Sequence, residues 1–142
     1  MTGKIAIIAA CLVFGGLVAQ RQPGWPGTYE CDGTGERGPY RAKLDIDELT
    51  ETYRLRWMME SGHLFTGVGL VIGVAANDLA VSYSDFTSTV GLAIYAKDGS
   101  GELQGRWTSI GADRVFTERC RRRGVRAARG STGRERSWTT TH

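Results

Sequence analysis

Between residues 27 and 118, short runs in which apolar and polar side chains alternate follow one another along the chain. In residues 40–47, the clearest run, every second position is apolar, and residues 53–60 repeat the pattern with an apolar side chain at each odd number. A period of two is typical of a strand with one buried face. No amphipathic helical pattern interrupts the runs, so we expect an all-β protein.

The connections between the runs are short and contain turn residues. Asp98 and Gly99 stand between two apolar runs, which is a strong hairpin signal. Connections this short make neighbouring strands pair antiparallel. We therefore predict an antiparallel meander of eight strands, at Gly27–Cys31, Tyr40–Ile46, Thr52–Glu60, Leu64–Ile72, Leu79–Tyr83, Val90–Ala96, Glu102–Thr108 and Arg114–Arg119.

An open meander would leave two unpaired strand edges, and closing the sheet removes both. Eight strands close around an interior that side chains fill or that holds one small ligand. Gly67, Gly69, Gly91 and Gly105 lie inside predicted strands, where glycine indicates a sharp bend or the close approach of another group. We expect a small closed or nearly closed barrel, and a two-layer β-sandwich is the alternative.

Charge is divided unevenly along the 142 residues, although the net charge is only +3. Residues 24–118 contain eight basic and fourteen acidic side chains, whereas residues 119–142 contain eight arginines and a single acid, Glu135. We expect a β-barrel-like domain over residues 27–119 and an arginine-rich disordered tail over residues 120–142. A shifted reading frame in a GC-rich gene is another explanation of the arginine bias.

The first 19 residues are predicted to be a signal peptide or an N-terminal anchor, followed by a linker over residues 20–26. Residues 5–19 form an apolar stretch after Lys4, shorter than the roughly 20 residues that span a bilayer. Cleavage after Ala19 is favoured, and lipidation of Cys11 is a further alternative. The protein is therefore expected to be exported, either periplasmic or extracellular, with anchoring through the N-terminus as a variant.

Export brings the protein into an oxidising compartment, where paired cysteines form disulfides. Cys31 ends the first predicted strand and Cys120 immediately follows the last, and closure of a barrel makes those two strands neighbours. We predict a Cys31–Cys120 disulfide. The sequence has no CxxC pair and no Cys/His cluster, so we expect neither a metal nor a cofactor.

The tail supplies candidate contacts to anionic surfaces. Arginine-rich segments attract anions without specificity, and an exported protein would meet anionic lipid or acidic polysaccharide. We do not expect nucleic acid as a partner, because exported proteins seldom meet it. The arginines assigned to this role are Arg121, Arg122, Arg123, Arg126 and Arg129.

Residues with catalytic chemistry are sparse. His63 stands in a predicted turn, and a Ser/His/Asp arrangement could be drawn from Ser82 or Ser84, His63 and Asp85. No nucleophile motif surrounds either serine. We expect a protein that is not an enzyme, with no catalytic residues.

Aromatic residues at alternating positions are core fillers in most barrels, and some line a pocket at the mouth. Trp57, Phe65, Tyr95 and Trp107 are candidates for the barrel interior. Trp25 and Tyr29 are candidates for a lid or a binding surface near the first strand.

The order of several short segments, from Gly27–Glu30 through Tyr53–Trp57 and Leu79–Tyr83 to the segment ending at Trp107, resembles small exported bacterial proteins commonly labelled fibronectin-binding proteins or left uncharacterised. The resemblance covers roughly residues 24–118. It implies an exported β-domain with an adhesive role and supplies no catalytic residues.

The sequence thus predicts an exported non-enzymatic binding module, which is either adhesive or binds a small apolar ligand. Its partner would be an extracellular or envelope macromolecule, or that ligand. A structural envelope protein without a ligand pocket and a hydrolase-like enzyme are the alternatives.

Overall fold

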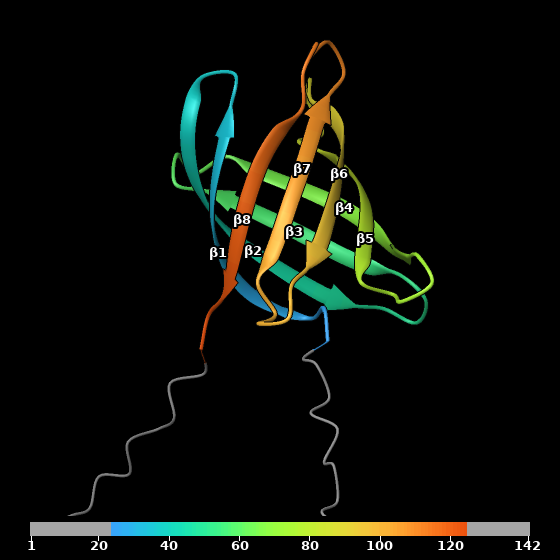
Figure 1. Ribbon diagram of the computed structural model, residues 1–142. Coiled ribbons are helices and arrows are strands. Elements are labelled where there is room, and N and C mark those ends of the chain that lie inside the picture. The colour runs from blue at the N-terminus through green and yellow to red at the C-terminus, as the bar shows by residue number, and fades with distance from the viewer. Residues whose placement is uncertain (1–23, 125–142) are drawn as a thin grey trace, which may run out of the picture.

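The computed structural model describes residues 24–124, which form an eight-stranded antiparallel β-barrel (Figure 1). Each strand pairs with its neighbours in sequence, and β8 pairs with β1 to close the sheet. The predicted closed meander is confirmed, and the sandwich alternative is wrong. The strands are β1 (Gly27–Gly35), β2 (Gly38–Glu48), β3 (Tyr53–Met59), β4 (Leu64–Ile72), β5 (Asp78–Ser84), β6 (Val90–Lys97), β7 (Leu103–Ser109) and β8 (Phe116–Arg122).

The strand that closes the barrel runs further than the sequence indicated. We expected the last strand to end at Arg119, but β8 continues to Arg122. Cys120, Arg121 and Arg122 therefore belong to the barrel, although the sequence placed them in the tail. The dense positive charge hid the strand pattern, in which buried Cys120 alternates with exposed Arg119 and Arg121. Pairing with the first half of β1 holds this extension in the sheet.

Inward-facing side chains fill most of the barrel interior. Leu44 and Leu55, from neighbouring strands, are completely buried, and their alternation with exposed polar residues matches the predicted period of two. The buried apolar set comprises Trp25, Tyr29, Cys31, Ala42, Leu44, Ile46, Leu55, Trp57, Leu79, Val81, Tyr83, Ala93, Tyr95, Leu103, Phe116 and Cys120.

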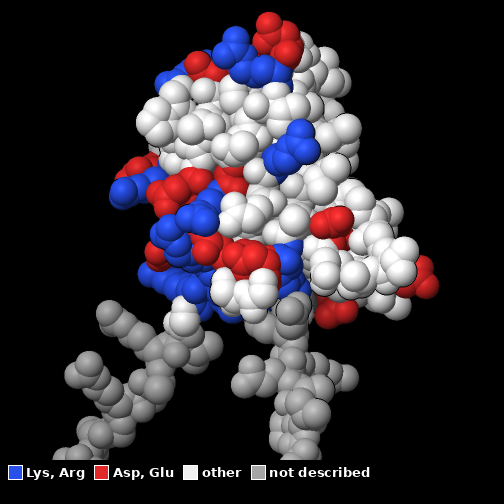
Figure 2. Space-filling view, in the orientation of Figure 1, with Lys and Arg blue, Asp and Glu red and all other residues white. Residues whose placement is uncertain are grey.

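The outer face is not uniformly polar. Val68 on β4 and Leu92 on β6 flank Ser82 of β5 in register, and Leu70 and Ile94 stand in the next outward row. These four apolar side chains are roughly half exposed to solvent. Outward charge gathers instead over β1 and β8, where arginines interleave with acids (Figure 2).

The two ends of the barrel differ in how they are filled. Both ends of the described chain lie at one end, at the bottom of Figure 1. There Trp25, which we had placed in a linker, is buried at 4% exposure, and the Tyr29 hydroxyl donates a hydrogen bond to the Trp25 carbonyl. Arg122 donates hydrogen bonds to the carbonyls of Gly24 and Pro26 and lies over the Tyr29 ring. These residues plug what we call the closed end.

Several expectations fall outside the described residues. They are the signal peptide or anchor over residues 1–19, lipidation of Cys11, and the roles given to Arg126 and Arg129. Within residues 24–124, no helix has the length and hydropathy needed to cross a bilayer.

Candidate ligand-binding site at the barrel mouth

The opposite end of the barrel, which we call the mouth, opens into a cavity of about 870 Å³. The turns after β1, β3 and β5 form its rim, and side chains from inside the barrel form its walls. Ligand pockets for small molecules have volumes of roughly 300–1,000 Å³. The cavity is therefore large enough for one small organic molecule.

Aromatic rings from six strands, β2 to β7, line this cavity. The Trp57 ring contacts Tyr83 and Tyr95, with ring centroids 5.9 and 6.5 Å apart. Tyr83 also meets Phe65 at 5.8 Å and Trp107 at 6.4 Å in edge-to-face geometry. Offset and edge-to-face contacts hold rings in fixed orientations. The cavity walls are thus preorganised apolar surfaces with ring edges and faces available to a planar ligand.

Glycines on adjacent strands create the space that the tyrosines occupy. A Cβ atom at Gly91 would lie 2.4 Å from the Tyr83 ring, and one at Gly105 would lie 2.7 Å from the Tyr95 ring. Each glycine is the cross-strand partner of the tyrosine that covers it. These in-strand glycines therefore mark the close approach of another group, here a tyrosine ring. Close approach was one of the two explanations predicted for them, and a sharp bend was the other.

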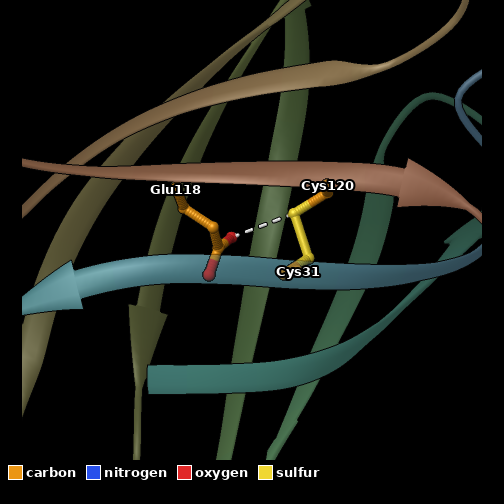
Figure 3. Close-up of side chains that lie close together, drawn as sticks. All are labelled: Cys31, Glu118 and Cys120. Atoms are coloured by element: carbon orange, nitrogen blue, oxygen red, sulfur yellow. Dashed lines mark hydrogen bonds between the residues drawn. A yellow bond between two sulfur atoms is a disulfide. The ribbon is translucent and has the colours of Figure 1, made fainter. Parts of the chain in front are cut away.

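A carboxyl group stands at the base of the cavity. Glu118 on β8 is 4% exposed, and its two oxygens accept hydrogen bonds from Tyr95 Oη at 2.6 Å and Tyr40 Oη at 2.8 Å. Trp57 Nε1 donates to Tyr95 Oη at 3.0 Å, so the chain of bonds runs from the cavity wall to the carboxyl group. Figure 3 shows Glu118 beside Cys120 on β8, across from Cys31 on β1.

Burial controls the protonation of these groups. Removal from water raises the pKa of Glu118, and the hydrogen bonds from Tyr95 and Tyr40 offset only part of that rise. Burial, with the nearby Glu118 carboxylate, also raises the pKa of Tyr83 to about 12 and those of Tyr40 and Tyr95 well above the ordinary value. At neutral pH the three tyrosines are neutral hydrogen-bonding groups.

Cys31 and Cys120 face each other in register and form a disulfide with Cα atoms 4.0 Å apart. Sγ of Cys120 lies 3.3 Å from Glu118 Oε1. Although Cys31, Cys120 and Glu118 present three potential metal ligands close together, the sulfurs bonded to each other are not thiolates. The cluster is a covalent joint between β1 and β8 beside the buried carboxyl group.

The rim carries a second polar pair. His63 Nε2 lies 3.1 Å from Asp85 Oδ2, and both residues line the cavity. Asp85 Oδ1 accepts hydrogen bonds from three consecutive backbone N–H groups, with that of Thr89 making the largest contribution to lowering the Asp85 pKa well below its usual range. The structure thus brings His63 and Asp85 together. Ser84 Oγ instead accepts a hydrogen bond from the Phe86 N–H, and Ser82 lies exposed on the outer face.

The structure sorts the predicted aromatic site residues into two groups. Trp57, Phe65, Tyr95 and Trp107 line the cavity. Trp25 and Tyr29 lie at the closed end, because the entering chain folds under the barrel instead of over its mouth.

Sequence reasoning missed Tyr40, Tyr83 and Glu118 as cavity residues. The two tyrosines stand at apolar positions of their alternating runs. The sequence does not show whether a ring at such a position lies at the mouth of the barrel or at its centre. Glu118 is two residues before Cys120, so the strand period places both on the inner face once β8 is known to continue.

The arginines assigned to anionic surfaces also differ in where their side chains lie. Arg121 is exposed and forms ion pairs with Glu102 and, at 4.0 Å, Asp32, and Arg123 pairs with Glu30. Arg122 points to the closed end and is held by backbone carbonyls and the Tyr29 hydroxyl. The strand period turns Arg122 inward, where its hydrogen bonds hold the closed end together. The contact of these arginines with an anionic surface stays a prediction.

The barrel resembles solved structures of designed proteins. A redesigned β-barrel, mFAP1, with DFHBI bound shares 15% sequence identity, with 68% of this chain and 94% of that chain covered and a TM-score of 0.54. Another redesigned β-barrel shares 16% identity over 70% of this chain and 91% of that chain, with a TM-score of 0.53. At these identities the likeness establishes a common fold. The chain matches no protein-family model, and no curated protein matches it in sequence.

Proposed function

We propose that the protein is a non-enzymatic binding module that holds one small, largely apolar aromatic molecule in the mouth of its barrel. The cavity of about 870 Å³ walled by aromatic rings is the observation that carries this proposal. It favours a ligand carrier over a structural envelope protein, for which a filled interior would be the more stable arrangement. Export and an adhesive role, which the resemblance implied, stay predictions.

The rings offer a ligand both packing area and geometry. Each buried aromatic contact that a ligand makes removes apolar surface from water, and ring–ring contacts add about 0.5–1.5 kcal/mol each. Because the rings already contact one another, little side-chain ordering is lost on binding. The DFHBI bound by mFAP1 is an example of a small molecule held by a barrel of similar fold.

Titration of the full chain with the uncharged fluorescent probe N-phenyl-1-naphthylamine tests the proposal. We expect a saturable rise in fluorescence with one site per chain. Phe65→Ala removes a ring from the cavity wall and should weaken binding about tenfold, from the loss of packing at one ring. Leu92→Ala, at an outer-face position that is 62% exposed, is the matched control and should bind as the wild type does.

The two variants show whether the probe binds in the cavity, because only Phe65→Ala alters the cavity wall. If a folded chain gives no saturable signal, or if Leu92→Ala weakens binding and Phe65→Ala does not, the cavity is not the binding site. Circular dichroism of each variant separates loss of binding from loss of fold.

A further inference from the structure

The ring-lined cavity has a buried acid at its base with no charged partner. Glu118 forms hydrogen bonds with two neutral phenols, and within residues 24–124 no Lys, Arg or His contributes to the environment that sets its pKa. The ion pairs of the described residues lie outside the barrel wall or at the rim, as with Arg119 and Glu102 or His63 and Asp85. Glu118 therefore differs from every paired acid in the described part of the chain.

A buried carboxylate without a counter-charge is costly, so the site either keeps a proton or receives a cation. Tyr40 and Tyr95 satisfy one lone pair on each oxygen, and a carboxylate has about four such acceptor positions. Acceptor capacity thus remains on the carboxyl group of a residue that lines the cavity. A ligand carrying N–H donors and a positive charge would use it.

The walls above Glu118 suit the same kind of ligand. The faces of aromatic rings attract cations, most strongly those of tryptophan, and Trp57 and Trp107 both line the cavity. The charged residues around the cavity are Glu36, Asp85 and Glu118 against Arg37, with His63 at the rim. An excess of acids at an entrance concentrates cations there.

We propose, as an extension of the proposed function, that the ligand is an aromatic compound carrying a protonated amino group, which pairs with Glu118 while its ring lies among Trp57, Tyr83 and Trp107. The ammonium group donates to the carboxylate oxygens and replaces the missing counter-charge. The hydrogen bonds from Tyr40 and Tyr95 fix the carboxylate so that both oxygens keep their positions. Glu118 is thus the residue that determines specificity for charge.

The groups that face Glu118 do not compete for this role. Tyr40 from β2, Tyr83 from β5 and Tyr95 from β6 all stay neutral at physiological pH, and the Cys31–Cys120 disulfide has no ionisable proton. Among these groups only Glu118 changes its charge in the physiological range, so selection for the amine should follow its titration. As pH falls through the raised pKa of Glu118, the carboxyl group takes a proton and the preference for the cation is lost.

A pair of matched ligands tests the inference in the full chain. 2-Naphthylmethylamine is protonated at neutral pH, and 2-naphthylmethanol has the same ring without the charge. Calorimetric titration at pH 7.5 should give at least about tenfold tighter binding of the amine. Glu118→Gln should remove that preference while the affinity for the alcohol stays within about twofold, since the amide keeps the shape of the side chain.

Two further measurements keep the inference testable if Glu118→Gln folds poorly. In the wild type, the ratio of amine to alcohol affinity should fall as pH is lowered, because Glu118 takes up a proton. The amine stays charged throughout, so the change reports on Glu118. Glu36→Gln, at the rim of the cavity, removes one of the acids that attract cations and should lower the ratio by no more than about twofold, because exposed charges attract weakly.

The results separate this inference from the proposed function. If the alcohol binds as tightly as the amine at every pH, or if Glu118→Gln keeps the preference, Glu118 does not select a cation and the cavity remains an aromatic site. If Glu36→Gln alone removes the preference, the rim is responsible and the assignment to Glu118 is wrong. If neither ligand binds a folded chain, both proposals are wrong.

Discussion

The closed end and the mouth of this barrel are built on the same eight strands but carry opposite charges inside. On the inner face of β8, Arg122 lies at the closed end and Glu118 lies four residues away towards the mouth. Arg122 is surrounded by acceptors, namely two backbone carbonyls and the Tyr29 hydroxyl. Glu118 has neutral donors only. The charge at the closed end thus has acceptors from the protein itself, whereas the charge at the mouth has capacity for a partner.

The difference shows what fills a small barrel. At the closed end the chain itself returns, because residues 24–26 fold under the strands and place Trp25 in the core. At the mouth the connections are short hairpin turns, and residues of three of them line the cavity together with the rings. Covering one end therefore required a segment outside the meander, and the mouth has no such segment among the described residues.

The largest effect should come from the disulfide, which joins β1 and β8 between the two ends. The bond closes a loop across a sequence separation of 89 residues, and constraint of the unfolded chain over such a span contributes roughly 4 kcal/mol. Cys31→Ala/Cys120→Ala should lower the free energy of unfolding by about that amount, measured by guanidinium unfolding. A Ser82→Ala control, at an exposed outer-face position that leaves the pair intact, should match the wild type. A loss below about 1 kcal/mol would mean that strand pairing alone closes the barrel.

The next effect separates the ends directly. Trp25→Ala removes a buried side chain from the closed end and should cost about 3 kcal/mol in the free energy of unfolding. The same variant should leave the affinity for N-phenyl-1-naphthylamine unchanged, because Trp25 is not among the residues that line the cavity. Phe65→Ala should show the reverse, with weaker binding and a smaller loss of stability at a half-buried position. Equal losses of affinity in both variants would show that the two ends are coupled.

The features that the two ends share could be predicted from the sequence, and the features that distinguish them could not. Strand number, direction and closure could be predicted because they depend on a period of two and on short turns, which are local features. The end of the barrel at which each aromatic ring lies could not be predicted, because the sequence around Trp25 and around Trp107 does not distinguish the closed end from the mouth. Arg122 was missed as an inward residue because arginines on either side of Cys120 made the end of the last strand look like a tail. Glu118 lies inside the predicted last strand, but a charged side chain gives no local sign that it faces inward.

A smaller effect distinguishes two neighbouring arginines. Arg122→Ala should cost about 2 kcal/mol in the free energy of unfolding, because it leaves the carbonyls of Gly24 and Pro26 without their donors at the closed end. Arg121→Ala, one residue earlier on the outer face, should cost less than about 0.5 kcal/mol, as exposed ion pairs do. Urea unfolding of the two variants gives the comparison. Similar costs would contradict the separation of β8 into an inner and an outer row.

The smallest effect is a change in the pH dependence of stability, and it belongs to the mouth. Burial raises the pKa of Glu118 above its ordinary 4.5. Below that value the carboxyl group is protonated in the folded and the unfolded chain. At higher pH the unfolded chain releases the proton first, so the free energy of unfolding falls by at most about 1.4 kcal/mol per pH unit until the raised pKa is passed.

Glu118→Gln has no proton to lose, so its stability should decline less than that of the wild type between about pH 4.5 and pH 7, by on the order of 1 kcal/mol. Asp45, Asp85 and Asp98, whose pKa values are lowered by hydrogen bonds, change stability in the opposite direction with pH. They are present in both proteins, so the difference between the two urea-unfolding series isolates Glu118. Parallel series would mean that Glu118 titrates as it does in the unfolded chain. The mouth would then carry an ordinary carboxylate, and its contrast with the closed end would reduce to shape.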